Sequence, residues 1–331
     1  MDINALKQAI QALAKSLQVA TVFPSALWVL ANVFLVVLPL NPEWNLSSGA
    51  SVTLIVSATL MLSYSLHAFN YPLQRLFEGY KFKYCRLFYP LQAYFEKKFV
   101  ETQREIRELR KEQQTREKFP ACKRTTQKAF PYCDLSEEEL RARLRRAASN
   151  LEFDYPSEQA KVLPTSLGNV MAAFEDYSRT RYGMDSIVLW QRLVPILREK
   201  GYLEFVAQEK AVFDFLMNTL VILLFLGVEL SYIYLWWGEV DRAIFFAFLT
   251  IVLCAILYWG MALAAQDWGG AVRVAFDLYR HDLFLHLGMV PGHDSSEDFD
   301  NWRAVSRFYL YRSTQAREFK GFRSHYQRTR G

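Results

Sequence analysis

The sequence predicts an all-α integral membrane protein with four transmembrane helices in two antiparallel hairpins and a helical cytoplasmic region. Its 331 residues are 52% apolar and 22% charged, yet the mean hydropathy is near zero because very apolar blocks alternate with very polar ones. Four of the blocks have the length of a membrane span, and the turns that join them in pairs hold almost no positive charge. No segment shows the convincing alternation of a β-strand.

Each apolar block matches the roughly 20 helical residues that cross a hydrocarbon core of about 30 Å. Three blocks contain no charged residue, and the third along the chain contains Asp214 and Glu229. Short turns, Asn41–Gly49 and Gly238–Arg242, join the blocks in pairs and predict the two hairpins. The four blocks are Val19–Leu40, Ser51–Phe69, Phe213–Trp237 and Ala243–Ala265.

Charge sets the expected orientation. Residues 71–210 hold 26 lysines and arginines against 20 acidic residues, and residues 266–331 hold 10 against 8. The two short turns together hold one basic residue, Arg242, and tryptophans such as Trp44 and Trp236 lie in or beside them. Because basic segments stay in the cytoplasm and tryptophans gather at the membrane interface, both termini and the middle region are expected inside.

The first 17 residues carry apolar side chains three and four positions apart, which predicts an amphipathic helix on the membrane surface or against the bundle. The expected organisation is an amphipathic helix at 1–18, a first hairpin at 19–70, a helical cytoplasmic region at 71–210, a second hairpin at 211–265, and C-terminal helices with a basic tail at 266–331.

The middle region contains a densely charged helix, Phe95–Lys118, with a thin apolar seam. Such a seam fits a short coiled coil or a helix that faces a partner, and a solvated helix is the alternative. The seam consists of Phe95, Phe99, Ile106 and Leu109.

Further helices of the middle region are marked by capping residues and breakers. A capping box at Ser136–Glu139 opens the first of them. Later helix starts are expected at Thr165 or Ser166 and at Asp185 or Ser186, breaks at Gly183 and near Pro195, and an unbroken helix from Tyr202 into the third span.

A short pattern follows the second span and again the fourth. It consists of an arginine and, two or three residues later, Phe-acid-x-Tyr. It suggests two repeats, each a hairpin followed by a juxtamembrane helix, with chance as the alternative. In both cases an acid lies close to an arginine, so ion pairs are expected at the inner interface between Arg75 and Glu78 and between Arg273 and Asp277.

Enzymatic patterns are missing from the sequence. The five histidines are scattered, and no phosphate-binding glycine loop, nucleophilic serine motif or zinc motif is present. The four cysteines lack ligand spacing and are expected as free thiols. Leu163–Asn169 either presents helix amides to an anion or is capped in the ordinary way. No enzymatic activity, metal or cofactor is therefore expected.

Two polar features lie within the expected spans. Glu229 is ionisable near the outer end of the third span, which makes it a functional candidate unless it reaches water or Arg242. The second span carries polar residues and Leu60 within about 40° of one line on a helix. In an oligomer this stripe would line an aqueous path; alternatively, it joins helices. The candidate pore-lining residues are Thr53, Ser57, Tyr64 and His67.

The C-terminal tail combines basic and aromatic residues with one acid, Glu318. Near an inner leaflet it predicts contact with anionic lipids, at about 1 kcal/mol per basic residue. Nucleic acid is not expected, because the tail is tethered to a membrane; a disordered terminus is the alternative. The basic residues are Arg312, Arg317, Lys320, Arg323, Arg328 and Arg330.

The segment Leu163–Asn169, followed by Glu175–Tyr177, Arg181–Gly183 and Trp190–Leu193, resembles a pattern of uncharacterised bacterial multi-pass membrane proteins. With Arg75–Tyr80, the resemblance spans most of the chain. It implies the bacterial cytoplasmic (inner) membrane and brings no assigned activity. Bestrophin-type anion channels are similar in topology, and Arg75-Leu-Phe-Glu-Gly79 resembles their Arg-aromatic-aromatic-Glu-Gly element with Leu76 in place of the first aromatic residue. The rest of the chain departs from that family.

Two functions from different classes follow. The first is a homo-oligomeric channel or pore, because four spans enclose little by themselves and several subunits would be needed around an axis. The second is a membrane-anchored scaffold or signalling protein that docks a cytoplasmic partner through residues 95–118 and the basic tail. An enzyme acting on a membrane substrate is less favoured, since no catalytic constellation is present.

Overall fold

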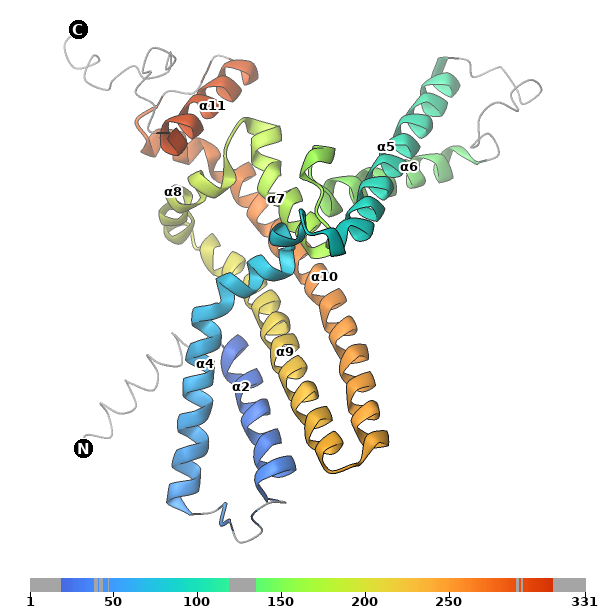
Figure 1. The fold of residues 1–331 in the computed structure, drawn as a ribbon. Helices are drawn as coiled ribbons and strands as arrows, with labels where there is room; N and C mark the ends of the chain where they lie inside the picture. The colour runs from blue at the N-terminus through green and yellow to red at the C-terminus, as the bar shows by residue number, and fades with distance from the viewer. Residues whose placement is uncertain are drawn as a thin grey trace, which may run out of the picture. The chain divides into compact units, whose positions relative to one another are not determined.

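The computed structural model describes residues 19–38, 41, 44–46, 48–118, 135–289, 292 and 294–311. Within these ranges every regular element is a helix and no strand occurs, which confirms the all-α prediction (Figure 1). The amphipathic helix expected at 1–18, the loop at 119–134 and the basic tail lie outside the described residues. The elements are α2 (Val19–Asn32), the π-helix η1 (Val33–Val37), α4 (Gly49–Glu78), η2 (Tyr80–Phe82), η3 (Arg86–Phe88), α5 (Tyr89–Lys118), α6 (Glu137–Asp154), η4 (Gln159–Lys161), α7 (Ser166–Tyr182), α8 (Ser186–Glu199), α9 (Tyr202–Trp236), α10 (Val240–His286) and α11 (Ser295–Tyr311).

Four helical segments are long and apolar enough to cross a membrane, namely residues 20–37, α4, α9 and α10. Their most apolar windows have mean hydropathies between 1.6 and 2.3. The four blocks expected from the sequence lie largely within these segments, although α4 and α10 continue well beyond the apolar part.

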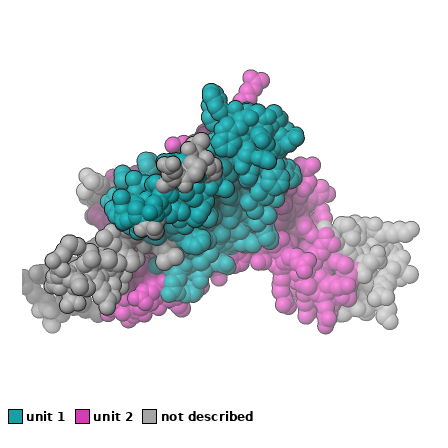
Figure 2. Space-filling view, turned by 90° about the horizontal axis from the view of Figure 1, so that it is seen from below, with its two compact units in different colours: residues 1–76, 205–268 teal, residues 77–204, 269–331 magenta. Residues whose placement is uncertain are grey.

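The chain divides into two compact units (Figure 2). Unit 1 comprises residues 1–76 and 205–268 and holds the apolar parts of all four long segments. Unit 2 comprises residues 77–204 and 269–331. Each unit has buried residues of its own, so each is described separately below.

Small residues allow close helix approach in unit 1. A Cβ added to Gly227 of α9 would lie 1.9 Å from the hydroxyl oxygen of Thr250 in α10. Nearer the turn, the rings of Tyr234 and Phe246 stack with centroids 5.1 Å apart. Packing of this kind, with glycine and threonine at the contact, is typical of helices that associate within a membrane.

In unit 2, α7 contacts α6, α8 and α11 and buries ten of its residues. The side chain of Thr165 caps its start by accepting the backbone N–H of Gly168 at 3.0 Å, and Gly183 ends it with a φ of 76°. The capping box of Ser136 and Glu139 opens α6. These local signals were correctly predicted, because caps depend on neighbours in the sequence.

Helix α8 begins after its N-cap Asp185, as expected, but it continues through Pro195 to Glu199. The predicted break near Pro195 is wrong. Proline removes one backbone hydrogen bond, but Leu193 and Ile196 on either side of it are buried and hold the helix against the core of unit 2. Helix α9 runs unbroken from Tyr202, as predicted.

Helices α5 and α6 lie side by side in unit 2 (Figure 1). Ile106 and Leu109 of α5 form one buried cluster with Leu140 and Ala147 of α6. Phe99, about two helical turns before Ile106, is also buried, and it packs against residues that follow α6. The apolar seam of α5 is therefore covered by the same chain and is not free to face a separate partner.

Candidate functional sites

The polar stripe predicted on the second span lies along α4. Thr53, Ser57, Tyr64 and His67 are all exposed, whereas Ser63 is buried and shares a 2.9 Å hydrogen bond with α2. The hydroxyl of Thr53 bonds to the helix backbone. For the side chains of Ser57, Tyr64 and His67, no hydrogen bond or ion pair is found within the described part of the chain. A helix that crosses a membrane with such a stripe needs water or another polar surface beside it.

Glu229 meets an amide of a distant helix. Its Oε2 accepts a hydrogen bond from Asn32 Nδ2 at 3.2 Å, and the same amide donates to the carbonyl of Trp28 at 3.1 Å. Arg242, the partner considered from the sequence, pairs with Glu239 at 3.2 Å. Asn32 is the last residue of α2, directly before the π-helix η1. Such helix irregularities are frequent at functional sites.

A second polar layer in unit 1 surrounds the start of the apolar part of α9. Asp214 is buried, and both its oxygens accept from Lys210 Nζ at 2.7 Å. The same ammonium lies 5.3 Å from the ring centre of Trp268. One turn farther on, the Asn218 amide donates to the backbone oxygen of Ala20 at 3.2 Å. The acid that interrupts the third span therefore has a counter-charge one turn before it.

At the end of α4, Glu78 is fully buried and its backbone oxygen accepts from Thr165 Oγ1 at 2.7 Å. Gly168 packs on the same carbonyl, since a Cβ there would lie 1.9 Å from the oxygen. The start of α7 is thus capped and covered by protein, which favours ordinary capping over an anion site at Leu163–Asn169. Arg75 donates to the hydroxyl of Tyr71 at 3.2 Å.

Arg273 and Asp277 lie in one cluster of unit 2 but have different hydrogen-bond partners. Asp277 accepts from the hydroxyls of Tyr182 at 2.6 Å and Tyr177 at 3.1 Å. Burial and the nearby Asp277 carboxylate raise the pKa of both tyrosines above the ordinary value. Arg273 donates to the backbone oxygen of Glu152 at 2.7 Å and faces the Tyr177 ring at 5.2 Å.

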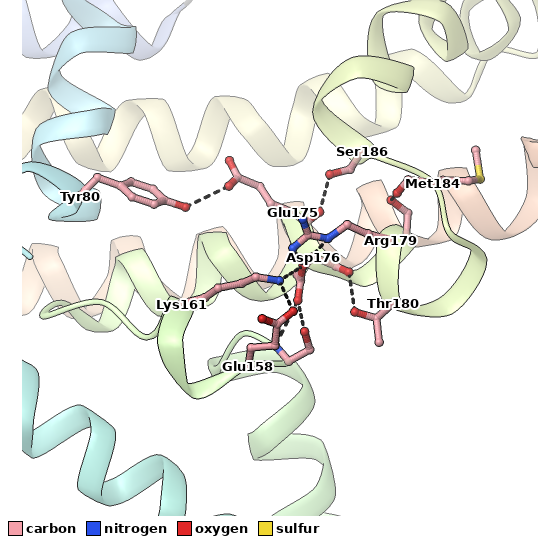
Figure 3. Close-up of polar contacts among 11 residues, drawn as sticks. Tyr80, Glu158, Lys161, Glu175, Asp176, Arg179, Thr180, Met184 and Ser186 are labelled. Atoms are coloured by element: carbon pink, nitrogen blue, oxygen red, sulfur yellow. Dashed lines mark hydrogen bonds and ion pairs between the residues drawn. The ribbon is translucent and has the colours of Figure 1, made fainter. Parts of the chain in front are cut away.

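Asp176 of α7 is the centre of a polar network that sequence reasoning missed (Figure 3). Its side chain is 5% exposed and accepts hydrogen bonds from Lys161, Arg179 and Ser157, at 2.8 Å from Lys161 and 3.0 Å from Arg179 Nε. Burial alone would raise the pKa of Asp176, but these hydrogen bonds lower it to about 2. The network attaches the segment before α7 to the helix itself. Asp176 lies within the Glu175–Tyr177 element of the resemblance, but nothing in the sequence indicated its three partners.

The remaining predicted features carry less information. Among the residues that the structure describes, no group of three or more histidine, cysteine, aspartate or glutamate side chains could hold a metal ion. The six basic residues of the tail lie outside the described residues.

The chain matches no protein-family model, no curated protein and no solved structure. Its function therefore has to be inferred from its own residues.

Proposed function

We propose that the protein is a homo-oligomeric membrane channel or pore, with α4 lining the path and unit 2 forming a cytoplasmic vestibule or gate. The observation that carries this proposal is the exposed polar stripe of Thr53, Ser57, Tyr64 and His67. A polar side chain facing lipid without a partner is costly, whereas a water-filled path satisfies it. Several copies around an axis would bring their α4 stripes together about such a path.

The proposed topology of the second hairpin is supported by contacts within unit 1. As the contacts on α9 advance from Gly227 to Tyr234, those on α10 retreat from Thr250 to Phe246. This is the order expected of an antiparallel pair joined by a short turn at Gly238, which has a φ of 79°.

The two hairpins would enter the membrane from the same side. Ala20 contacts Asn218 and Asn32 contacts Glu229, so positions on α2 and α9 advance together, as in a parallel pair. With the charge bias of the sequence, this supports cytoplasmic termini and a cytoplasmic unit 2. The resemblance of the sequence points to the bacterial inner membrane.

Contact with anionic lipids at the inner leaflet is supported by a segment just beyond α4 as well as by the tail. Residues 80–94 contain no acid and interleave aromatic residues with bases such as Lys81 and Arg86. Tyr84 and Leu87 are 90% and 80% exposed. Aromatic and basic side chains together favour the headgroup region of a membrane with negative charge.

Reconstitution into planar bilayers tests the channel. The protein should conduct, and a single cysteine at Ser57, in a variant whose four natural cysteines are serine, should make the current sensitive to a charged thiol reagent. Such reagents react with thiolates in water and hardly at all with thiols that face lipid. A cysteine at Val52, which is exposed but lies about 140° away from Ser57 around the helix, is the control and should leave the current unaffected.

The absence of conductance at every pH, voltage and membrane tension would refute the channel, and so would a monomeric particle. Equal block of the Ser57 and Val52 variants would refute α4 as the lining helix.

A membrane-anchored scaffold is the second candidate. It is favoured by Arg145 and Arg146 of α6, which are exposed and have no ion pair among the described residues. They would dock an acidic cytoplasmic protein. Arg145→Glu with Arg146→Glu should then release a co-purifying partner without changing the membrane fold; if nothing co-purifies with the unaltered protein, the scaffold loses its support.

A further inference from the structure

A cleft of about 630 Å³ opens in unit 2 between α5, α6 and α7. This volume lies within the range of roughly 300–1,000 Å³ typical of small-molecule sites. Its wall includes Phe99, Ile106, Leu151 and Tyr155, which supply apolar and aromatic surface. The amide group of Gln103 and the hydroxyl groups of Ser157 and Thr180 lie among these side chains. An apolar wall with a few polar groups is the usual composition of a ligand site.

Three arginines from two helices line the same cleft: Arg107 and Arg110 of α5 and Arg181 of α7. All three are exposed, and none has an ion pair among the described residues. Two acids also line it, Glu152 and Asp176. Asp176 is already held by two cations outside the arginine group, so the cleft has an excess of positive charge.

A fourth arginine lies directly behind the wall of the cleft. Arg273 is 6% exposed, and two of its guanidinium nitrogens, Nε and Nη1, have no hydrogen-bond partner among the residues that the structure describes. It contacts Glu152 and Tyr177, both of which line the cleft. The carboxylates of Glu152 and Asp277 both interact electrostatically with Arg273, but neither accepts a hydrogen bond from it among the described residues, and Asp277 is bonded to tyrosine hydroxyls instead.

Buried polar groups are rarely left unpaired, and a buried cation without a full set of partners is costly. A negative charge placed in the cleft would lower this cost, because Tyr177 and Glu152 both line the cleft and contact Arg273. The buried guanidinium and the exposed arginine group therefore point independently to an anionic ligand.

We propose that the cleft binds an organic phosphate of nucleotide size, a site that goes beyond the channel function and does not depend on it. The phosphate lies among Arg107, Arg110 and Arg181, because the guanidinium fork matches phosphate oxygens in geometry and charge. The body of the ligand packs on the apolar wall, chiefly on the half-buried Ala148 and Leu151, with the almost fully buried Phe99 and Tyr155 beneath them. Inorganic phosphate would contact only the three arginines, and an unphosphorylated nucleoside would contact only the apolar wall.

Equilibrium binding to the purified full-length protein in detergent tests the proposal, with AMP and ATP as probes and adenosine, inorganic phosphate and glycerol 3-phosphate as comparisons. AMP or ATP should bind at least about tenfold more tightly than any of the three. Glycerol 3-phosphate carries the phosphate chemistry of a lipid headgroup. Tighter binding of glycerol 3-phosphate than of AMP would refute the proposal that the ligand is of nucleotide size.

Arg110→Gln with Arg181→Gln should weaken AMP or ATP binding by about tenfold or more. The matched control is Arg145→Gln with Arg146→Gln, which removes two exposed arginines of α6 that do not line the cleft. It should bind as the unaltered protein does. Equal thermal unfolding midpoints would establish that both variants are folded. Failure of AMP and ATP to bind, or equal loss in both variants, would overturn the proposal, whether or not the protein conducts.

Discussion

Replacing Asp176 by asparagine should loosen the segment 157–161 from α7. The ionised carboxylate accepts from Lys161, Arg179 and Ser157 while its side chain is 5% exposed. Asparagine keeps the shape of the side chain but removes the charge, and it therefore resembles the protonated form of Asp176. The segment and the helix meet within unit 2, so the effect should be local.

The magnitude follows from the pKa. The pKa of Asp176 is about 2 in the folded protein against 3.8 as its ordinary value. This gap corresponds to about 2 kcal/mol of stability at neutral pH. Because the folded pKa is the lower one, the stabilisation is fully present above about pH 4 and is lost as the pH falls toward 2.

Hydrogen–deuterium exchange followed by mass spectrometry measures the effect on the full-length protein in detergent. At pH 7, amides of residues 155–163 should exchange up to about 30-fold faster in Asp176→Asn than in the unaltered protein. The difference should shrink between pH 4 and pH 2, after correction for intrinsic exchange rates. Other carboxylates titrate in both proteins, so the comparison isolates Asp176.

Glu158→Gln is the matched control. Glu158 also pairs with Lys161, at 2.8 Å, but its side chain is 64% exposed, and such pairs contribute little. Amide exchange of residues 155–163 in Glu158→Gln should therefore stay close to that in the unaltered protein. Equal exchange in Asp176→Asn and the unaltered protein at pH 7, or a difference that persists undiminished at pH 2, would refute the role assigned to this carboxylate.

Three substitutions test the packing. Gly168→Ala places a methyl group against the backbone oxygen at the end of α4 and should destabilise unit 2 by about 1–3 kcal/mol, seen as a lower unfolding midpoint; Gly49→Ala, with open space around it, should not. Leu109→Ala removes a fully buried side chain between α5 and α6 and should cost about 2–5 kcal/mol, measured as faster amide exchange in α6, whereas unchanged exchange would contradict the seam packing. Gly227→Ala should separate α9 from α10 and lower the detergent resistance of unit 1, because the methyl group overlaps Thr250; a variant as resistant as the original protein would contradict that contact.

Several elements could be predicted because their causes are local in sequence. The capping residues Ser136, Thr165 and Asp185 each bond to an amide three positions away, and the structure has all three. The polar stripe of α4 follows from the helical period, but exposure does not set it apart, because apolar residues such as Leu54 and Met61 are exposed too. Pro195 misled the prediction because a proline's local cost was outweighed by buried neighbours that only the folded unit supplies.

Contacts between distant positions could not be predicted. Asn32 and Glu229 are 197 positions apart, and nothing in the sequence around either residue indicates the other. The seam of α5 indicated a buried face, but a partner protein, a second copy and α6 of the same chain would all satisfy the same apolar pattern. The structure selects α6.

The sequence alone predicted that this chain forms helices, where several helices of the middle region begin, and that four segments are apolar enough to cross a membrane. Those properties depend on residues within one or two turns of each other and on hydropathy summed along a helix. Only the tertiary structure decided which helix faces which, and it thereby produced the Asp176 network and the arginine-lined cleft. These sites combine residues from separate helices or loops, and their energies depend on burial and distance, which no single segment contains.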